Sequence, residues 1–294
     1  MGYKWSRAFQ DWYQLYLQLL CIVVLPIVII TSYSFCDNFK MWLVNQLKPY
    51  EGQLTDFILI LFVLASQLNS YIFIMTILFF SMCLLIRKIR KINNAYILNS
   101  NSEFRRLHIH SYFEYWIAYH LMGVRDCQLT LVPIPMQFKL ILQGPFSNYL
   151  YKEGVQDTID DSKACVSIDR IGNLLNDKDC EINLVLSDTY PINLVEQCPQ
   201  AIARKTLSIS RIHENFTRIH SRIFIESVLN EVRNLPTTIT TIHIYATLNP
   251  WNAYEIAKEV FKTGGRDSIE CLYVYYQSQE GTRPFMSAEK INLK

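Results

Sequence analysis

The sequence contains no pair of cysteines at CxxC spacing. Its eight cysteines stand singly and its six histidines show no metal-ligand spacing, so we expect neither a zinc site nor a disulfide framework. GxSxG, P-loop and HExxH motifs are also missing, as is a catalytic Cys–His signature. We therefore expect a protein that is not an enzyme and needs no metal or cofactor, with reduced thiols.

Charge is missing from two long runs near the N-terminus. Residues 12–36 and 57–86 contain no Asp, Glu, Lys or Arg. At about 1.5 Å of rise per residue, each run is long enough to cross a hydrocarbon core of about 30 Å as a helix. A cleaved signal peptide is the competing interpretation of the first run, but no small-residue cleavage site follows it. The sequence therefore predicts a two-helix transmembrane region within residues 1–91.

Positive charge flanks these two runs on one side of the membrane. Lys4 and Arg7 precede the first run, and "RKIRK" at 87–91 directly follows the second, whereas the linker between the runs has balanced charge. Cytoplasmic segments next to spans carry the excess of Lys and Arg. We therefore expect both termini in the cytoplasm.

The second run carries polar residues near its middle. Most lie within "ASQLNS" at 65–70, and one more, Thr76, follows six residues later. Such side chains in a bilayer face protein or water. One interpretation is a helix seam in a homo-oligomer, and the other is the lining of a pore. Two helices cannot enclose water, so a pore requires several copies. The residues concerned are Ser66, Gln67, Asn69, Ser70 and Thr76.

The rest of the chain divides into a connecting helix at 92–124 and a domain at 125–294. For the connection, Ser102 is the predicted N-cap and Gly123 the predicted stop of a helix. Residues 107–294 hold 18 basic and 21 acidic side chains, so binding to duplex DNA or RNA is not expected.

The domain alternates between predicted strands and helices. The strands are expected at 127–134, 164–168, 181–190, 205–210, 240–248 and 270–277, the last being the final one. The helices are expected within 216–236, where Ile225, Val228, Leu229 and Val232 share a face, and at 249–265. Crossover connections of this length favour a partly parallel, Rossmann-like α/β layer, which binds ligands at the carboxyl ends of its strands.

Two features of the domain suit a phosphate-bearing ligand. Asn249 and Pro250 are predicted to begin a helix whose free amides attract an anion, with Trp251 beside them as a stacking surface. Residues 204–222 also gather basic side chains, including Arg204 and Arg211. The simpler interpretations are an ordinary capped helix with a partly buried Trp and a solvated helix face.

The stretch 181–277 resembles a SAVED domain, the sensor module of bacterial cyclic-oligonucleotide anti-phage systems (CBASS). The resemblance lies in "INLVLSDTYPI", "SRIFIESVLNEVRNL", "IHIYATLNPWNAYEIAKEVF" and "CLYVYY". With the two preceding runs, the chain resembles the two-transmembrane SAVED effectors of the bacterial inner membrane. The resemblance implies a CARF-related fold and a cyclic oligonucleotide made by a partner nucleotidyltransferase. The predicted ligand-binding residues are Thr247, Asn249, Trp251, Asn252, Arg211, Arg204 and Ser187.

These observations lead to one main hypothesis and two alternatives. The main hypothesis is an effector that binds a cyclic oligonucleotide, oligomerises and permeabilises the lipid bilayer by a pore or by disruption. The first alternative is a membrane-tethered cyclic-nucleotide phosphodiesterase or nuclease. The second is a non-conducting membrane scaffold that recruits a partner.

Overall fold

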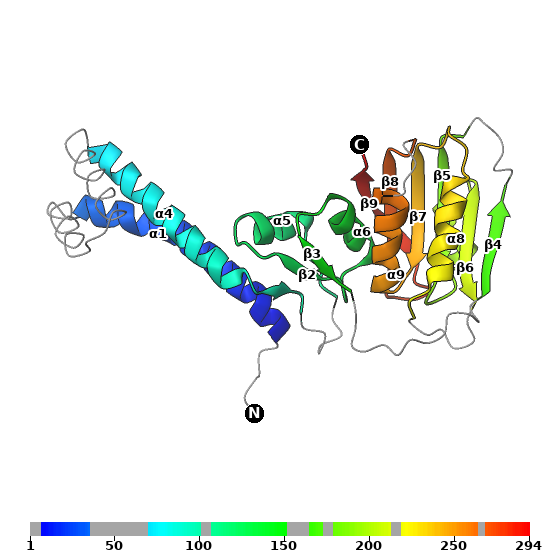
Figure 1. Ribbon diagram of the computed structural model, residues 1–294, viewed down its shortest axis with the longest axis horizontal. Coiled ribbons are helices and arrows are strands. Elements are labelled where there is room, and N and C mark those ends of the chain that lie inside the picture. The colour runs from blue at the N-terminus through cyan, green and yellow to red at the C-terminus, as the bar shows by residue number, and fades with distance from the viewer. Residues whose placement is uncertain are drawn as a thin grey trace, which may run out of the picture. The chain divides into compact units, whose positions relative to one another are not determined.

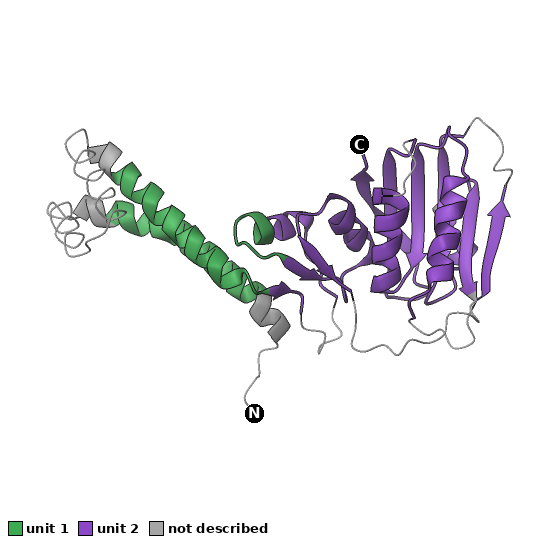
Figure 2. Ribbon diagram, in the orientation of Figure 1, with its two compact units in different colours: residues 1–96, 117–125 green, residues 97–116, 126–294 purple. Residues whose placement is uncertain are grey.

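The computed structural model describes residues 7–35, 70–100, 107–151, 165–172, 179–212, 219–263 and 268–294. Its internal contacts divide the chain into two compact units, which Figure 2 shows in green and purple. Unit 1 comprises residues 1–96 and 117–125, and unit 2 comprises residues 97–116 and 126–294. The domain boundaries expected after residues 91 and 124 stay predictions about which parts fold independently.

Two helices make up most of unit 1 and lie side by side (Figure 1): α1 (Arg7–Phe35) and α4 (Ser70–Asn93). Within the described residues, one helical stretch, Trp12–Thr31, is long and apolar enough to cross a membrane, with a mean hydropathy of 2.3. A helix whose outer face is also apolar suits lipid rather than water. The outward side chains of α1 include Leu17, Leu20, Val23, Val24, Ile27, Val28 and Ile30.

The second charge-free run is described only in its later part. Residues 70–86 form the beginning of α4, whereas residues 57–69 lie outside the described part. Of the polar residues expected to face a seam or a pore, Ser66, Gln67 and Asn69 also lie outside it. Ser70 begins α4, and Thr76 lies half-buried one and a half turns later.

A reciprocal pair of amides joins α1 to the end of α4. Gln18 Nε2 donates to Asn93 Oδ1 at 3.1 Å, and Asn93 Nδ2 donates to Gln18 Oε1 at 2.7 Å. Asn93 Nδ2 also donates to the Met122 carbonyl at 3.0 Å, and Asn93 is 2% exposed. Buried amides are costly without partners, so this network sets the register of α1 against α4 within unit 1.

The connecting helix is shorter than expected. It is α5 (Tyr112–His120), and residues 107–111 before it are not helical, so the prediction of one helix over 102–123 was wrong. The N-terminal signal is a capping box in which Ser111 and Glu114 exchange backbone–side-chain hydrogen bonds at 2.7 and 3.3 Å. The predicted stop at Gly123 is confirmed, because Gly123 has a φ of +76° and accompanies the 3.0 Å bond from the Val124 amide to the Ala118 carbonyl.

A small parallel sheet opens unit 2, in the order β1 (Ile97–Leu98), β2 (Asp126–Gln128) and β3 (Asn148–Leu150). The expected strand at 127–134 was too long, since α6 (Ile134–Gln143) begins at its end. Leu131 turns the chain with a φ of 63°, and the prolines at 133 and 135 suit the first turn of a helix.

The second sheet of unit 2 has six strands in the order β4-β6-β5-β7-β8-β9. Strands β6, β5, β7 and β8 are parallel, and the antiparallel β4 and β9 form the edges, so the expected partly parallel α/β layer is confirmed. The prediction that 270–277 is the final strand was wrong. The strands are β4 (Cys165–Ile171), β5 (Glu181–Ser187), β6 (Thr206–Ile212), β7 (Thr241–Thr247), β8 (Cys271–Gln277) and β9 (Phe285–Asn292).

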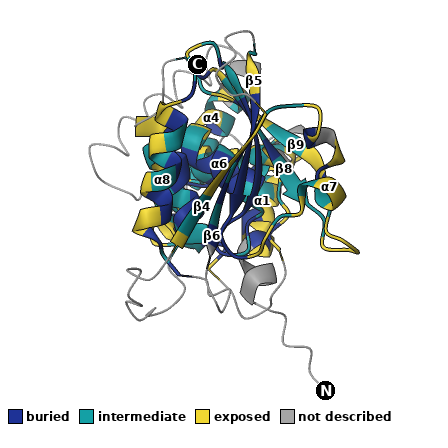
Figure 3. Ribbon diagram, turned by 90° about the vertical axis from the view of Figure 1, so that its right-hand side faces the viewer, coloured by how far each residue is buried: buried dark blue, intermediate teal, exposed yellow. Residues whose placement is uncertain are grey.

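Helices cover one face of this sheet, and its middle strands are almost wholly buried (Figure 3). The helices are α8 (Arg222–Arg233) and α9 (Pro250–Glu255), which continues as the π-helix η3 (Ile256–Thr263). Helix α8 buries Phe224, Ile225, Val228 and Val232, which confirms its apolar face; each such side chain stabilises the fold by about 1.5–3 kcal/mol.

A short segment packs against the opposite face. It consists of α7 (Leu194–Gln197) and the 3₁₀ turn η2 (Pro199–Ala201). Cys198 and Ala201 from this segment form one buried cluster with Val185, Tyr245 and Phe285 from the strands. The sheet therefore has a core on both faces at its centre.

One buried histidine contributes to the pH dependence of stability. His108 is 8% exposed, its amide donates to the Leu131 carbonyl at 2.9 Å, and burial lowers its pKa to about 4. A histidine in the unfolded chain has a pKa of about 6.5, so the unfolded state takes up the proton first. We expect the free energy of unfolding to fall as pH drops from about 6.5 to about 4. His108→Leu should reduce this slope in unfolding of the detergent-solubilised protein, and an unchanged slope would contradict the assignment to His108.

Candidate ligand-binding site

A buried carboxylate organises the carboxyl ends of β5 and β7. Asp188, just after β5, receives a hydrogen bond from Arg211 Nε of β6 at 2.6 Å, and both side chains are 0% exposed. Its other oxygen accepts from the Asn249 amide at 3.2 Å, from Asn249 Nδ2 at 3.1 Å and from Asn252 Nδ2 at 2.9 Å. Burial raises the pKa of Asp188, while Arg211 and Asn252 oppose that shift.

This network occupies the start of α9. Asn249 caps the helix by accepting a hydrogen bond from the Asn252 amide at 2.8 Å. The Asn249 amide points to Asp188, so the protein's own carboxylate takes the place that the sequence suggested for an external anion. Asn249 and Asn252 also donate to the Ile219 carbonyl at 2.8 and 3.1 Å, which ties the approach to α8 to the same centre.

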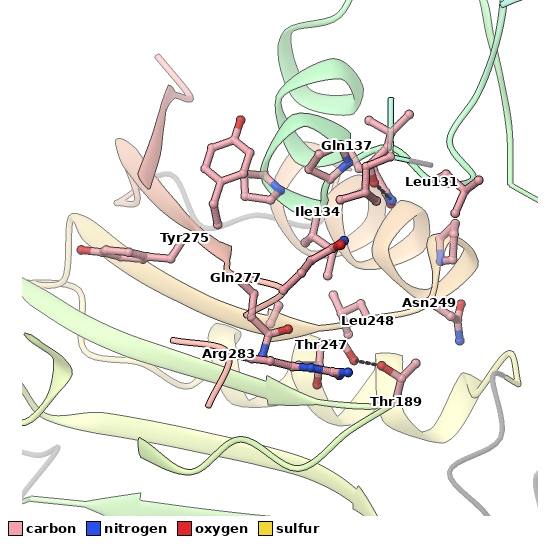
Figure 4. Close-up of a pocket in the computed structure, with 18 of the residues that line it drawn as sticks. Leu131, Ile134, Gln137, Thr189, Thr247, Leu248, Asn249, Tyr275, Gln277 and Arg283 are labelled. Atoms are coloured by element: carbon pink, nitrogen blue, oxygen red, sulfur yellow. Dashed lines mark hydrogen bonds between the residues drawn. The ribbon is translucent and has the colours of Figure 1, made fainter. Parts of the chain in front are cut away.

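Beside this network lies a pocket of about 840 Å³ within unit 2 (Figure 4). One wall comes from the turn before α6 and from α6 itself, with Leu131, Ile134 and Gln137. The opposite wall comes from the strand ends, where Thr189 Oγ1 donates to the Thr247 carbonyl at 2.9 Å. The pocket has the size and the mixed apolar and polar lining of a small-ligand site. The remaining lining residues are Leu107, Ile109, Val132, Pro133, Pro135, Tyr190, Ala246, Leu248, Asn249, Pro250, Tyr275, Tyr276, Gln277, Gln279 and Arg283.

Among the described lining residues, Arg283 alone carries a charge. It stands in the turn between β8 and β9 with a φ of 56°, and its exposed guanidinium lies 5.5 Å from the centre of the Tyr190 ring. A cation over a tyrosine face is stabilised by the ring quadrupole, which holds the guanidinium at the pocket.

Two further lining residues are a buried glutamine and a tyrosine. Gln137 is 3% exposed and donates to the Val132 carbonyl at 2.7 Å, while its Oε1 has no hydrogen-bond partner within the described residues. Tyr275 stacks on Tyr245 with 4.3 Å between ring centres, and its hydroxyl lies 3.0 Å from His243 Nδ1. Burial lowers the pKa of His243, so a neutral imidazole positions the Tyr275 ring.

The structure brings two of the seven predicted site residues to the pocket, Thr247 and Asn249. Arg211 and Asn252 are buried in the Asp188 network, where both donate to Asp188, and their contact with a ligand stays a prediction. Ser187 Oγ accepts a hydrogen bond from the Ile192 backbone amide at 3.3 Å, and Ser187 is not among the residues that line the pocket.

The other two predicted residues also lie away from the pocket lining. Trp251 stacks on His220 with 4.3 Å between ring centres, and its Nε1 donates to Glu255 at 2.9 Å. Arg204 pairs with Glu181 at 3.2 Å, at the edge where β5 begins, whereas the pocket lies where β5 ends. Contact of either side chain with a ligand stays a prediction.

The sequence interpretation missed Arg283, Tyr190, Gln137 and Tyr275. Arg283 and Gln137 lie outside the stretch that carried the SAVED resemblance, and Arg283 belongs to a hairpin whose second strand was not predicted. The one usable signal was "GTRPF" at 281–285, where Gly and Pro bracket an Arg in a turn.

Removing Asp188 tests the buried network. Asp188→Ala leaves the Arg211 charge buried without its partner, so we expect a loss of about 3–5 kcal/mol in the free energy of unfolding. The matched control is Arg170→Ala, which breaks an ion pair with Glu231 in which the Arg170 side chain is 55% exposed. That change should cost about 0–1 kcal/mol. Chemical denaturation of both variants in detergent measures the difference, and equal losses would contradict a central role for Asp188.

Two solved structures are similar to this chain, both of the SAVED/CARF-domain receptor Cap4 from Acinetobacter baumannii. The one with the cyclic trinucleotide 3'3'3'-cAAA has 10% identity and a TM-score of 0.39, over 62% of this chain and 42% of the receptor. The one with 2'3'3'-cAAA has 10% identity and a TM-score of 0.40, over 71% of this chain and 43% of the receptor. This chain therefore matches less than half of the receptor's length, and a likeness at this level identifies no ligand.

A family model gives the broader match. None of the curated proteins matches the chain. The model of the SMODS- and Ubiquitin system-associated 2TM effector domain matches residues 4–291, nearly the whole sequence. This match confirms that the resemblance to two-transmembrane effectors was correct. The chain belongs to the family of SMODS- and Ubiquitin system-associated 2TM effector domains.

Proposed function

We propose that the chain is a membrane effector of a bacterial anti-phage system. A cyclic oligonucleotide, made by a partner nucleotidyltransferase, binds unit 2; the chain then forms homo-oligomers and permeabilises the inner membrane. Family membership supports the effector role, and the SAVED-like stretch at 181–277 supports the ligand class. The observation that carries the proposal is the pocket with Arg283, Gln137 and tyrosines in one lining.

The pocket chemistry suits a nucleotide with phosphodiester links. The Arg283 guanidinium offers paired donors to phosphate oxygens, as arginine does in phosphate recognition. Tyrosine rings offer faces on which bases stack. Gln137 contributes a polar side chain to the same lining, where it donates to the Val132 carbonyl. Thr247 and Asn249 remain candidate contacts at the carboxyl end of β7.

The membrane part of the proposal rests on unit 1. Helix α1 holds the apolar stretch Trp12–Thr31, and α4 continues a charge-free run that begins at residue 57. We propose that both helices span the membrane with both termini in the cytoplasm. The chain passes between the two units after residue 96, within helix α5 and after residue 125, and we propose that these crossings carry ligand binding to the spans.

Replacing Arg283 tests the pocket. Arg283→Gln removes a charge-assisted contact worth about 1.5–3 kcal/mol, so we expect ligand affinity to fall about 10- to 150-fold. Calorimetry with a panel of cyclic di-, tri- and tetranucleotides first identifies the ligand and then measures the loss. The matched control, Arg170→Gln, removes an exposed arginine of β4 and should leave affinity unchanged. Equal affinities of wild type and Arg283→Gln would contradict the site.

Dye release from vesicles tests permeabilisation. Protein reconstituted in vesicles should release an encapsulated dye when the identified ligand is added, because assembly in the bilayer opens a path for water. Arg283→Gln should require about 10- to 150-fold more ligand for half-maximal release. Inserted protein that binds ligand without release would favour the scaffold alternative. Cleaved ligand after incubation with the protein would favour the phosphodiesterase or nuclease alternative. The proposed effector should leave the ligand uncleaved.

A further inference from the structure

The end of α4 carries a strongly basic surface that the ligand pocket does not use. Arg87, Lys88, Arg90 and Lys91 fall within the last two turns of the helix, and all four are exposed. They directly follow the charge-free residues 70–86 of the same helix. The four side chains are called the α4 basic surface here.

The backbone beneath this surface is firmly held. Asn93 binds Gln18 and the Met122 carbonyl, as described above, and Ile89 is 4% exposed. Gly123 has a φ of +76°, and a Cβ atom there would lie 2.7 Å from Arg90 Cγ, so the stem of Arg90 packs directly on the chain at Gly123. The charged groups therefore project from an ordered helix end, in the unit drawn green in Figure 2.

The described residues of unit 1 carry little negative charge to balance these cations. They include six basic side chains (Arg7, the four of the α4 basic surface and Arg125) against one acidic side chain, Asp11. Within the part of the chain that the structure describes, none of the four makes an ion pair. The helix dipole favours cations in the last turn only, so it does not account for Arg87 and Lys88.

We propose that the α4 basic surface binds the phosphate groups of anionic phospholipids. This inference rests on the proposed membrane insertion of α1 and α4, which sets the end of the charge-free stretch at the level of the headgroups. Each Lys or Arg near an anionic leaflet contributes about 1 kcal/mol of attraction, which strengthens binding about fivefold. Four cations at one helix end therefore select anionic over zwitterionic lipids around the spans. The surface makes the effector sensitive to the lipid composition of the leaflet on the side of unit 2.

Spin-labelled lipids test this selection without measuring effector activity. The full chain is reconstituted in phosphatidylcholine vesicles that contain a trace of spin-labelled phosphatidylglycerol or spin-labelled phosphatidylcholine. The motionally restricted fraction of each label gives their relative affinities for the protein. We expect phosphatidylglycerol to be preferred about fivefold at low salt, with the preference decreasing in 1 M NaCl, where the Debye length is about 3 Å.

The variants separate charge from fold. The triple variant Arg87→Gln, Lys88→Gln and Lys91→Gln keeps Arg90, whose stem packs on Gly123, and should lose the preference. The control Arg87→Lys keeps the charge and should retain it. Protease accessibility of unit 2 verifies that all proteins have the same orientation. Equal preference in wild type and triple variant, or no preference in inserted wild type, overturns the lipid proposal while insertion stands. A wild type that floats with neither vesicle type overturns both the insertion and the lipid site.

Discussion

The buried pair of Asp188 and Arg211 is the constraint on which the carboxyl edge of the large sheet depends. One carboxylate receives donors from β6, from the chain after β7 and from the first turn of α9. Two charges without contact with water are tolerated only when their hydrogen-bonding groups are matched, and here amides of Asn249 and Asn252 supply the remaining donors. The loop geometry that shapes one wall of the pocket follows from this requirement, because Thr189 directly follows Asp188 in the chain and Asn249 belongs to the network.

Local patterns in the sequence were sufficient for the centre of unit 2. The patterns of β5, β7 and β8 predicted strands of a partly parallel sheet, and the spacing of Ile225, Val228 and Val232 predicted α8. Strand β9 has no such pattern: only Phe285 and Ile291 are buried along its length, because it lies at an edge and is specified by pairing with β8. The apolar residues of segment 129–133 led to the wrong prediction of a strand as far as residue 134. In the structure they form a turn that leads into α6.

The candidate site was harder to predict than the fold. In the sequence, Arg211 looks like an ordinary surface cation. Only the structure shows that it is buried, with its Nε 2.6 Å from Asp188 Oδ1. Trp251 was expected to offer a ring on which a nucleotide base stacks, but the structure stacks His220 on that ring. Arg283 and Gln137 are separated by more than a hundred residues and meet at one pocket through the packing of α6 near β8 and β9. Spacing in the sequence carries no information about such a meeting.

The amide pair between Gln18 and Asn93 restricts the mechanics of the two helices. Sliding of α1 along α4 by a single residue, about 1.5 Å, would break the two reciprocal hydrogen bonds at once, while Asn93 keeps its bond to the Met122 carbonyl. Tilting or rotation of the two helices together preserves both bonds. The two helices of unit 1 are therefore expected to move together, and the bond from Asn93 to the Met122 carbonyl links them to the residues that follow α5.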